Sequence, residues 1–212
     1  MEEPRAPLHG FGVKLAKPEL RDEGMTAVFP YLEGKTRAEL LGETLTAQGA
    51  DAEVSAIRAA MDEIYNIRPE ERKPFAVTPE FIKVFNALGE LDFYRDKETE
   101  NGGGWASLGA VLADESYSAS NIDALFENML VTADGTYAID YEWVFLFPVP
   151  AGFVKYRTLV YFYRRYKSLL GGQAEREFIG QFPESATIVA HNATLNNFLR
   201  IFISPFLFKI CI

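Results

Sequence analysis

The chain has 212 residues, 48% hydrophobic and 14% aromatic, which is enough to bury the core of one large domain. Its 30 acidic residues outnumber its 21 Lys and Arg residues, the net charge is −9, and no long basic run suggests a nucleic-acid-binding face. The single cysteine, Cys211, excludes an internal disulfide, and the two histidines, His9 and His191, form no Cys/His cluster of the kind that binds zinc.

The sequences of the two termini indicate where in the cell the protein is expected. The N-terminal "MEEPRAPLHG" lacks the positive start and apolar run of a secretory signal. The apolar C-terminal run "FLRIFISPFLFKICI" is shorter than the roughly 20 residues that a transmembrane helix needs, and Arg200, Pro205 and Lys209 interrupt it. It predicts a buried terminal helix, with a partner-binding or membrane-surface segment as the alternative. We expect a cytoplasmic protein without a transmembrane span, or one held at the membrane periphery.

The first elements lie before residue 42. The β-branched and apolar run "TAVF", residues 26–29, predicts a buried strand. Thr36 and Glu39 have the spacing of a capping box, which predicts the start of a helix that continues through Leu41.

Residues 42–51 predict a loop, and Asp51 at its end could cap a second helix. The apolar face of that helix consists of Val54, Ile57, Met61 and Ile64. Thr78 followed by Pro79 predicts the start of a third helix, with an apolar face made of Phe81, Phe85 and Leu88. Residues 89–120 predict an irregular insertion. Its "ENGGGW" has neither the preceding strand nor the Gly-Lys-Ser/Thr of a phosphate-binding loop.

The stretch "NIDALFENMLVTADGTYAIDYEW" combines a hairpin with carboxylates. "NMLVT" and "TYAID" predict two strands joined at Asp134-Gly135. Such a hairpin brings Asn128 close to Asp140, and the loop that holds Asp123 could return to the same place. Oxygen ligands of this kind bind Mg²⁺ together with phosphate oxygens and water, and a remaining carboxylate could accept a proton from a hydroxyl. The alternative is a surface hairpin with polar ends.

A long helix is predicted over residues 153–170, where Gly171 ends it. Its apolar face holds Tyr156, Leu159, Tyr163, Tyr166 and Leu170. Arg157, on the same helix, could pair with an acid near the polar end of the hairpin.

The order Asp123, Asn128 five residues later, a hairpin and then Asp140 has the spacing of the kinase catalytic core. "IDYEW" resembles the aminoglycoside phosphotransferase and choline kinase branch of the kinase-like fold. More narrowly, "NID…FEN", "IDYEWVF" and "FPVPAGFVKYRTL" resemble bacterial kinase-like domains that accompany glycosyltransferases or methyltransferases of cell-surface polysaccharide synthesis. The resemblance covers residues 26–170. It implies an α+β fold, with a remnant of the small lobe and the hinge over residues 1–33 and a helical large lobe over residues 34–212.

The resemblance also implies roles for single residues. Asp123 would be the catalytic base, and Asn128 and Asp140 would be the Mg²⁺ ligands. "AVFPYLEGKT" resembles the hinge, whose backbone would contact the adenine of ATP at Pro30, Tyr31 and Leu32. Asn121 stands where most kinases have histidine, and its amide can still bond the loop backbone.

The small lobe departs from the kinase pattern. Lys14 is too close to the hinge for the strands and helix that separate the ATP-binding lysine from the hinge. "FGVKLAK" therefore predicts one strand of an incomplete small lobe, which is truncated or supplied by another polypeptide. The function expected is an ATP- and Mg²⁺-dependent phosphotransferase acting on a hydroxyl of a sugar or related small molecule, with little turnover by the isolated chain. The alternative is an inactive kinase-like scaffold that binds a glycan-synthesis partner, with the C-terminal aromatic run as its contact.

Overall fold

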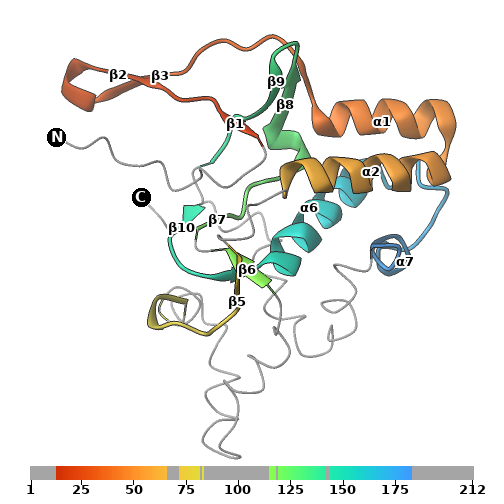
Figure 1. Cartoon of the computed structure of the whole chain (residues 1–212). Helices are drawn as coiled ribbons and strands as arrows, with labels where there is room; N and C mark the ends of the chain where they lie inside the picture. Colours follow the sequence, from red (N-terminus) through yellow and green to blue (C-terminus); the bar gives the residue numbers. More distant parts are fainter. Residues whose placement is uncertain are drawn as a thin grey trace, which may run out of the picture.

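The computed structural model describes residues 13–65, 72–81, 83, 115–117, 119–141 and 144–182. Over these ranges the fold is mixed α+β, with small sheets beside a group of helices (Figure 1). The helices are α1 (Arg37–Gln48), α2 (Ala50–Ile64), α6 (Ala151–Tyr166) and α7 (Glu175–Ile179), with 3₁₀ turns η1 (Asp22–Gly24) and η3 (Phe126–Asn128). None of the helices that the structure describes has the length and apolar character needed to cross a bilayer.

The strands within the described ranges form four small sheets. Their bounds are β1 (Lys14–Leu15), β2 (Glu19–Arg21), β3 (Thr26–Val28), β4 (Lys35–Thr36), β5 (Arg72–Pro74), β6 (Glu115–Tyr117), β7 (Ser120–Asn121), β8 (Met129–Thr132), β9 (Gly135–Ala138), β10 (Val144–Phe145) and β11 (Val149–Pro150). The sheet orders are β1-β9-β8-β4, β10-β7, β11-β6-β5 and β2-β3. The predicted hairpin is confirmed as β8–β9, which we call the central hairpin. Antiparallel β4 covers one of its edges and parallel β1 covers the other.

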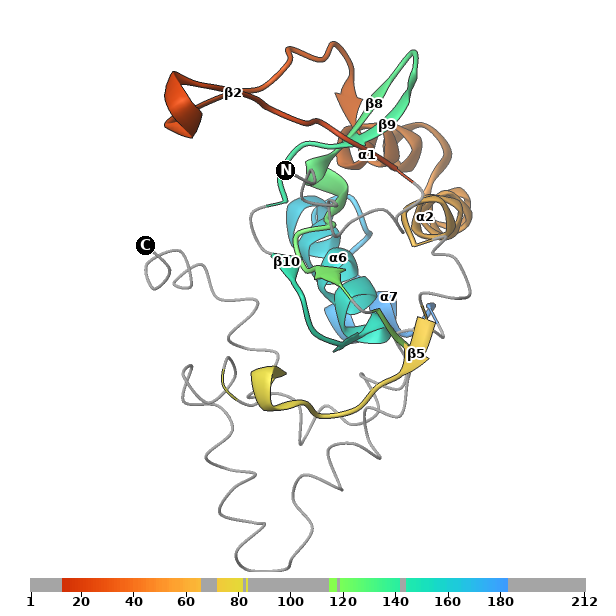
Figure 2. The same ribbon diagram turned by 60° about the vertical axis from the view of Figure 1, so that its left-hand side comes forward.

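Strands β2 and β3 form a separate antiparallel ribbon, which we call the outer ribbon. It extends away from the helices in both views (Figures 1 and 2). The strand predicted at residues 26–29 is confirmed as β3, but its predicted burial is wrong, because all three residues of β3 are exposed. The three residues of β2 are exposed as well, so the apolar pattern of β3 meets solvent.

Helix α1 begins with the predicted capping box. The Glu39 N–H donates to the Thr36 hydroxyl at 3.2 Å, and the Thr36 N–H donates to the Glu39 carboxylate at 2.8 Å. The loop predicted at residues 42–51 is wrong, because α1 continues to Gln48. Gly42 is buried against the ring of Tyr166 on α6, so helix packing outweighs the weak helix propensity of glycine.

Helix α2 starts at Ala50 after Gly49, so Asp51 lies inside the first turn and is not the N-cap as predicted. Its apolar face is confirmed, with Ile57, Met61 and Ile64 buried and Val54 half-buried. Helix α6 confirms the last predicted helix but ends earlier, at Tyr166, and Gly171 adopts a positive φ of 64° in the following turn.

The insertion predicted over residues 89–120 is wrong at its end, because β6 and β7 are strands there. Strand β6 pairs with β11 and β5, and β7 pairs with β10. Residues 84–114, which include Phe85 and Leu88, lie outside the described ranges. Both histidines and the C-terminal run also lie outside them. The third predicted helix start is supported by Phe81, whose N–H donates to the Thr78 hydroxyl at 3.2 Å.

Candidate functional site

The candidate site is built on residues 121–128, which we call the polar loop. It connects β7 to the central hairpin and is mostly buried. The Asn121 side-chain oxygen accepts the Asp123 N–H at 2.9 Å, which confirms the expected amide-to-backbone bond. Asn121 is only 2% exposed, so this bond fixes the loop from within.

Asp123 and Asn128 meet across one turn of the polar loop. The Asn128 side-chain amide donates to the Asp123 backbone carbonyl at 3.0 Å. The Leu125 N–H donates to the same carbonyl at 2.7 Å. The bond uses the nitrogen of the Asn128 amide, which orients its side-chain oxygen away from the Asp123 carbonyl. The spacing of five residues therefore corresponds to a closed turn in the structure.

Asp140 follows β9 at the same end of the central hairpin. The last strand pair is Met129 with Ala138, and the Ile139 N–H donates to the Asn128 carbonyl at 3.0 Å, which extends the ladder by one bond. Asp140 is the next residue and is exposed. Asn128 and Asp140 are therefore held by the same end of one hairpin, as the sequence predicts.

Arg157 of α6 binds the polar loop through two hydrogen bonds. Its Nη2 donates to the Asp123 carboxylate at 2.8 Å, and its Nε donates to the Ile122 carbonyl at 2.9 Å. Both charged side chains are about 10% exposed. The guanidinium also lies over the Tyr161 ring at 4.7 Å from its centroid. A planar, permanently charged guanidinium with several donors suits such a double contact. The pairing with a nearby acid, which the sequence allowed for Arg157, is present in the structure.

Two buried hydroxyls bind the next carbonyl of the loop. The Tyr65 hydroxyl donates to the Ala124 carbonyl at 3.0 Å and lies 2.8 Å from the Thr158 hydroxyl, which is 3.0 Å from the same carbonyl. Burial raises the pKa of Tyr65 well above its ordinary range, so the phenol remains a donor. Neither residue could be identified from the sequence, because a single hydroxyl in or next to an apolar helix gives no pattern.

The predicted nucleotide-contacting residues lie between the outer ribbon and β4. Pro30 and Tyr31 are exposed, Tyr31 by 92%, and Leu32 is half-buried. This segment leads into Lys35–Thr36, which pairs with Val131 and Leu130 of the central hairpin. The sheet therefore connects the expected hinge segment to the hairpin whose open end is flanked by Asn128 and Asp140. Glu142 and Trp143 lie outside the described residues.

The oxygen atoms of Asn128 and Asp140 suit a hard cation that also binds ligands from outside the protein. Among the described residues, no three His, Cys, Asp or Glu side chains form a ready-made metal site. Asn128 and Asp140 instead offer one amide and one exposed carboxylate at one hairpin end. Mg²⁺ is commonly held by one or two carboxylates, with phosphate oxygens and water completing its shell. The residues present therefore fit a Mg²⁺–phosphate group better than a metal held by protein alone.

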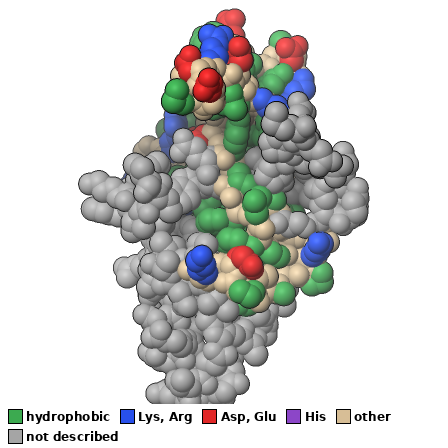
Figure 3. All heavy atoms as spheres, turned by 90° about the vertical axis from the view of Figure 1, so that its left-hand side faces the viewer, with side chains coloured by type: hydrophobic (Ala, Val, Ile, Leu, Met, Phe, Trp, Pro, Cys, Tyr) green, Lys and Arg blue, Asp and Glu red, His purple; other side chains and the backbone are tan. Residues whose placement is uncertain are grey.

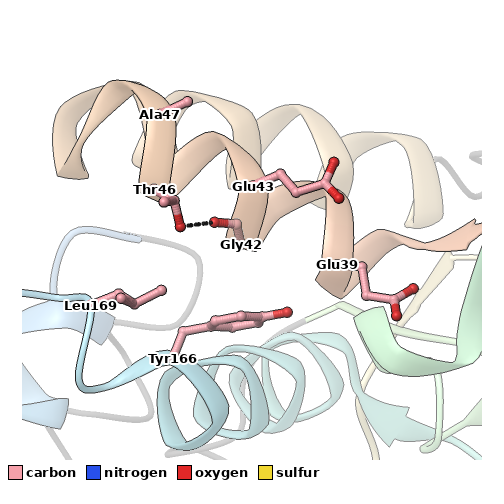
Figure 4. A pocket seen from close by; sticks show the side chains of 7 residues that line it. All are labelled: Glu39, Gly42, Glu43, Thr46, Ala47, Tyr166 and Leu169. Carbon is pink, nitrogen blue, oxygen red and sulfur yellow. Dashed lines mark hydrogen bonds between the residues drawn. The ribbon is translucent and has the colours of Figure 1, made fainter.

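A hollow lies between α1 and the end of α6 (Figure 4). Its volume is about 450 Å³, and its lining consists of Glu39, Gly42, Glu43, Thr46, Ala47, Tyr166 and Leu169. The polar groups already have local partners, since Glu39 closes the α1 capping box and Glu43 binds Lys35 at 2.6 Å. This hollow contains none of the predicted site residues.

Comparisons of the chain with protein families, with curated proteins and with solved structures found no match.

Proposed function

We propose that the chain is a kinase-like module that binds a nucleotide with Mg²⁺ at the polar loop and transfers phosphate to a hydroxyl of a sugar or related small molecule. The observation that carries the proposal is the pair of bonds at Asn128. Its side chain binds the Asp123 carbonyl while its own carbonyl binds Ile139, next to Asp140. One residue thus ties a candidate base and a candidate metal ligand to the same hairpin end.

The roles follow from the chemistry of the side chains. Asp123 would accept the proton of the acceptor hydroxyl, and Arg157 orients its carboxylate through a 2.8 Å contact. Asn128 and Asp140 would hold Mg²⁺, which would neutralise the charge of the nucleotide phosphates. The backbone at Pro30, Tyr31 and Leu32 would contact the adenine. A glycosyltransferase or methyltransferase module of polysaccharide synthesis is the proposed partner.

The Asp123–Arg157 pair also favours a second function, that of a binding module without turnover. The Asp123 side chain is only about 10% exposed and is held in an ion pair. A substrate hydroxyl must reach this carboxylate before it can act as a base. In the second function the polar loop keeps its nucleotide or partner site while the protein serves as a scaffold.

The test is calorimetric titration of the full chain with ATP and Mg²⁺. We expect magnesium-dependent binding that Asp140→Ala abolishes. Asp134→Ala, an exposed aspartate at the other end of the central hairpin, is the matched control and should bind as the parent does. Absence of binding at millimolar nucleotide contradicts the phosphotransferase form of the proposal.

Turnover separates the two forms. Asp123→Asn should keep nucleotide binding and abolish any ADP production with sugar acceptors. Parent protein that binds nucleotide but forms no ADP with any hydroxyl acceptor supports the scaffold.

A further inference from the structure

The outer ribbon consists of two paired strands, neither of which has a buried residue. All six residues of β2 and β3 are exposed, and both views show the ribbon away from the helices (Figures 1 and 2). An isolated two-stranded hairpin is at best marginally stable in water, and further strands or a packed face normally support it. The ribbon is therefore an element whose stabilising neighbour is absent from the described part of the chain.

One face of the ribbon carries Leu20 and Ala27, and the other carries Glu19 and Arg21 beside Val28 and Thr26. Leu20 is paired with Ala27, and side chains alternate along a strand, so these two residues share a face opposite to that of Glu19 and Arg21. Leu20 is 65% exposed. Figure 3, in which this end of the molecule faces the viewer, shows acidic, basic and apolar side chains together at the top.

Strand β2 is complementary to itself. Its order is negative, apolar, positive, and Arg21 already contacts Glu19 at 2.9 Å. In an antiparallel pair of two β2 strands centred on Leu20, each Glu19 lies opposite the Arg21 of the other copy. Charges on an edge strand usually discourage pairing, but opposite charges placed across from each other stabilise an antiparallel pair. Among the described strands β2 pairs with β3 alone, which leaves its outer edge to a second copy.

We propose that two copies of the chain associate around a two-fold axis by pairing β2 with β2. The result is a four-stranded sheet in the order β3-β2-β2-β3, with Leu20 and Ala27 of both copies on one face. A two-fold contact uses the same surface on both partners, as this strand requires. Because each β2 has only three residues, the interface is small, and we expect a weak dimer that forms at high protein concentration. The proposal does not depend on nucleotide binding.

Sedimentation velocity over a range of protein concentrations tests the pairing. We expect the parent protein to shift from monomer to dimer. Glu19→Arg and Arg21→Glu each place like charges opposite each other, and each should weaken the dimer by about tenfold or more. An equimolar mixture of the two variants restores opposite charges across the pair and should recover the dimer. Glu33→Arg makes the same charge change at an exposed residue outside the ribbon and should dimerise as the parent does.

Three results contradict the proposal. One is a parent protein that stays monomeric at every concentration. Another is a dimer that neither single variant weakens, which places the contact elsewhere. The third is a mixture of the variants that stays monomeric although each variant gives the circular dichroism spectrum of the folded parent.

Discussion

The central hairpin and the outer ribbon, both within the described residues, differ in what surrounds them. In the central hairpin, Met129 and Ala138 are buried, β1 and β4 pair with its outer edges, and the polar loop leads into its first strand. In the outer ribbon every strand residue is exposed and both edges lack a described neighbour. The backbone pairing is antiparallel in both. Strand pairing is thus common to both hairpins, whereas burial and paired edges distinguish the hairpin that positions the candidate functional groups.

The largest effect expected is that of Arg157→Met. Met fills a similar apolar volume but removes the guanidinium, which leaves the buried Asp123 carboxylate and the Ile122 carbonyl without these donors. Breaking a buried ion pair from one side costs about 3–5 kcal/mol. Urea unfolding should show this loss in the free energy of unfolding.

A double-mutant cycle with Asp123→Asn isolates the pair itself. We expect the double variant to lose less stability than the sum of the two single variants, because no unpaired charge remains. Additive losses mean that Arg157 stabilises the loop only through its packing and its bond to Ile122.

The next prediction compares one apolar truncation in each hairpin. Met129→Ala removes a side chain with 0% exposure in β8, and such changes cost about 2–5 kcal/mol. Leu20→Ala removes one that is 65% exposed in β2, and the monomer should change by no more than about 0.5 kcal/mol. Unfolding is measured at low protein concentration, where the proposed dimer is absent. Equal losses contradict the difference in packing between the two hairpins.

The sequence predicted the parts of the site that local spacing determines. Asp134-Gly135 specified the central hairpin, and a spacing of five placed Asn128 against the Asp123 carbonyl. Thr36 and Glu39 specified the start of α1 in the same way, because a capping box is closed within one turn. The mixed α+β class, which the resemblance implied, is confirmed. The kinase-like arrangement remains a proposal.

Some contacts between distant segments could not be predicted. The bonds of Tyr65 and Thr158 to Ala124 join α2 and α6 to the polar loop, and no sequence period marks them. Helix α1 continues through Gly42 because Tyr166 packs there, more than a hundred residues away. The exposure of Thr26–Val28 was missed for the opposite reason, since an apolar pattern predicts burial without saying what covers it.

The smallest effect expected concerns Glu127 in the polar loop. Burial raises the pKa of its carboxyl above 4.5, and its Oε2 is buried without a hydrogen-bond partner among the described residues. The folded state therefore keeps a proton that the unfolded chain releases above pH 4.5. The stabilising contribution is complete below that pH and is lost as the pH rises through the folded pKa. Glu127→Gln should reduce this fall in the free energy of unfolding. Urea unfolding at a series of pH values above 4.5 measures it.

Glu53 of α2 gives a dependence of the same sign, because complete burial raises its pKa to about 7. Glu127→Gln alone should thus flatten the pH dependence in part, and adding Glu53→Gln should flatten it further up to about pH 7. Glu23→Gln in the exposed turn of the outer ribbon removes one negative charge without touching the packed region, and is the matched control. A slope that both Glu127→Gln and Glu53→Gln leave unchanged means that these carboxyls ionise alike in the folded and unfolded chain. In that case water reaches Glu127 in the folded chain. The region around the central hairpin would then differ from the outer ribbon in packing alone.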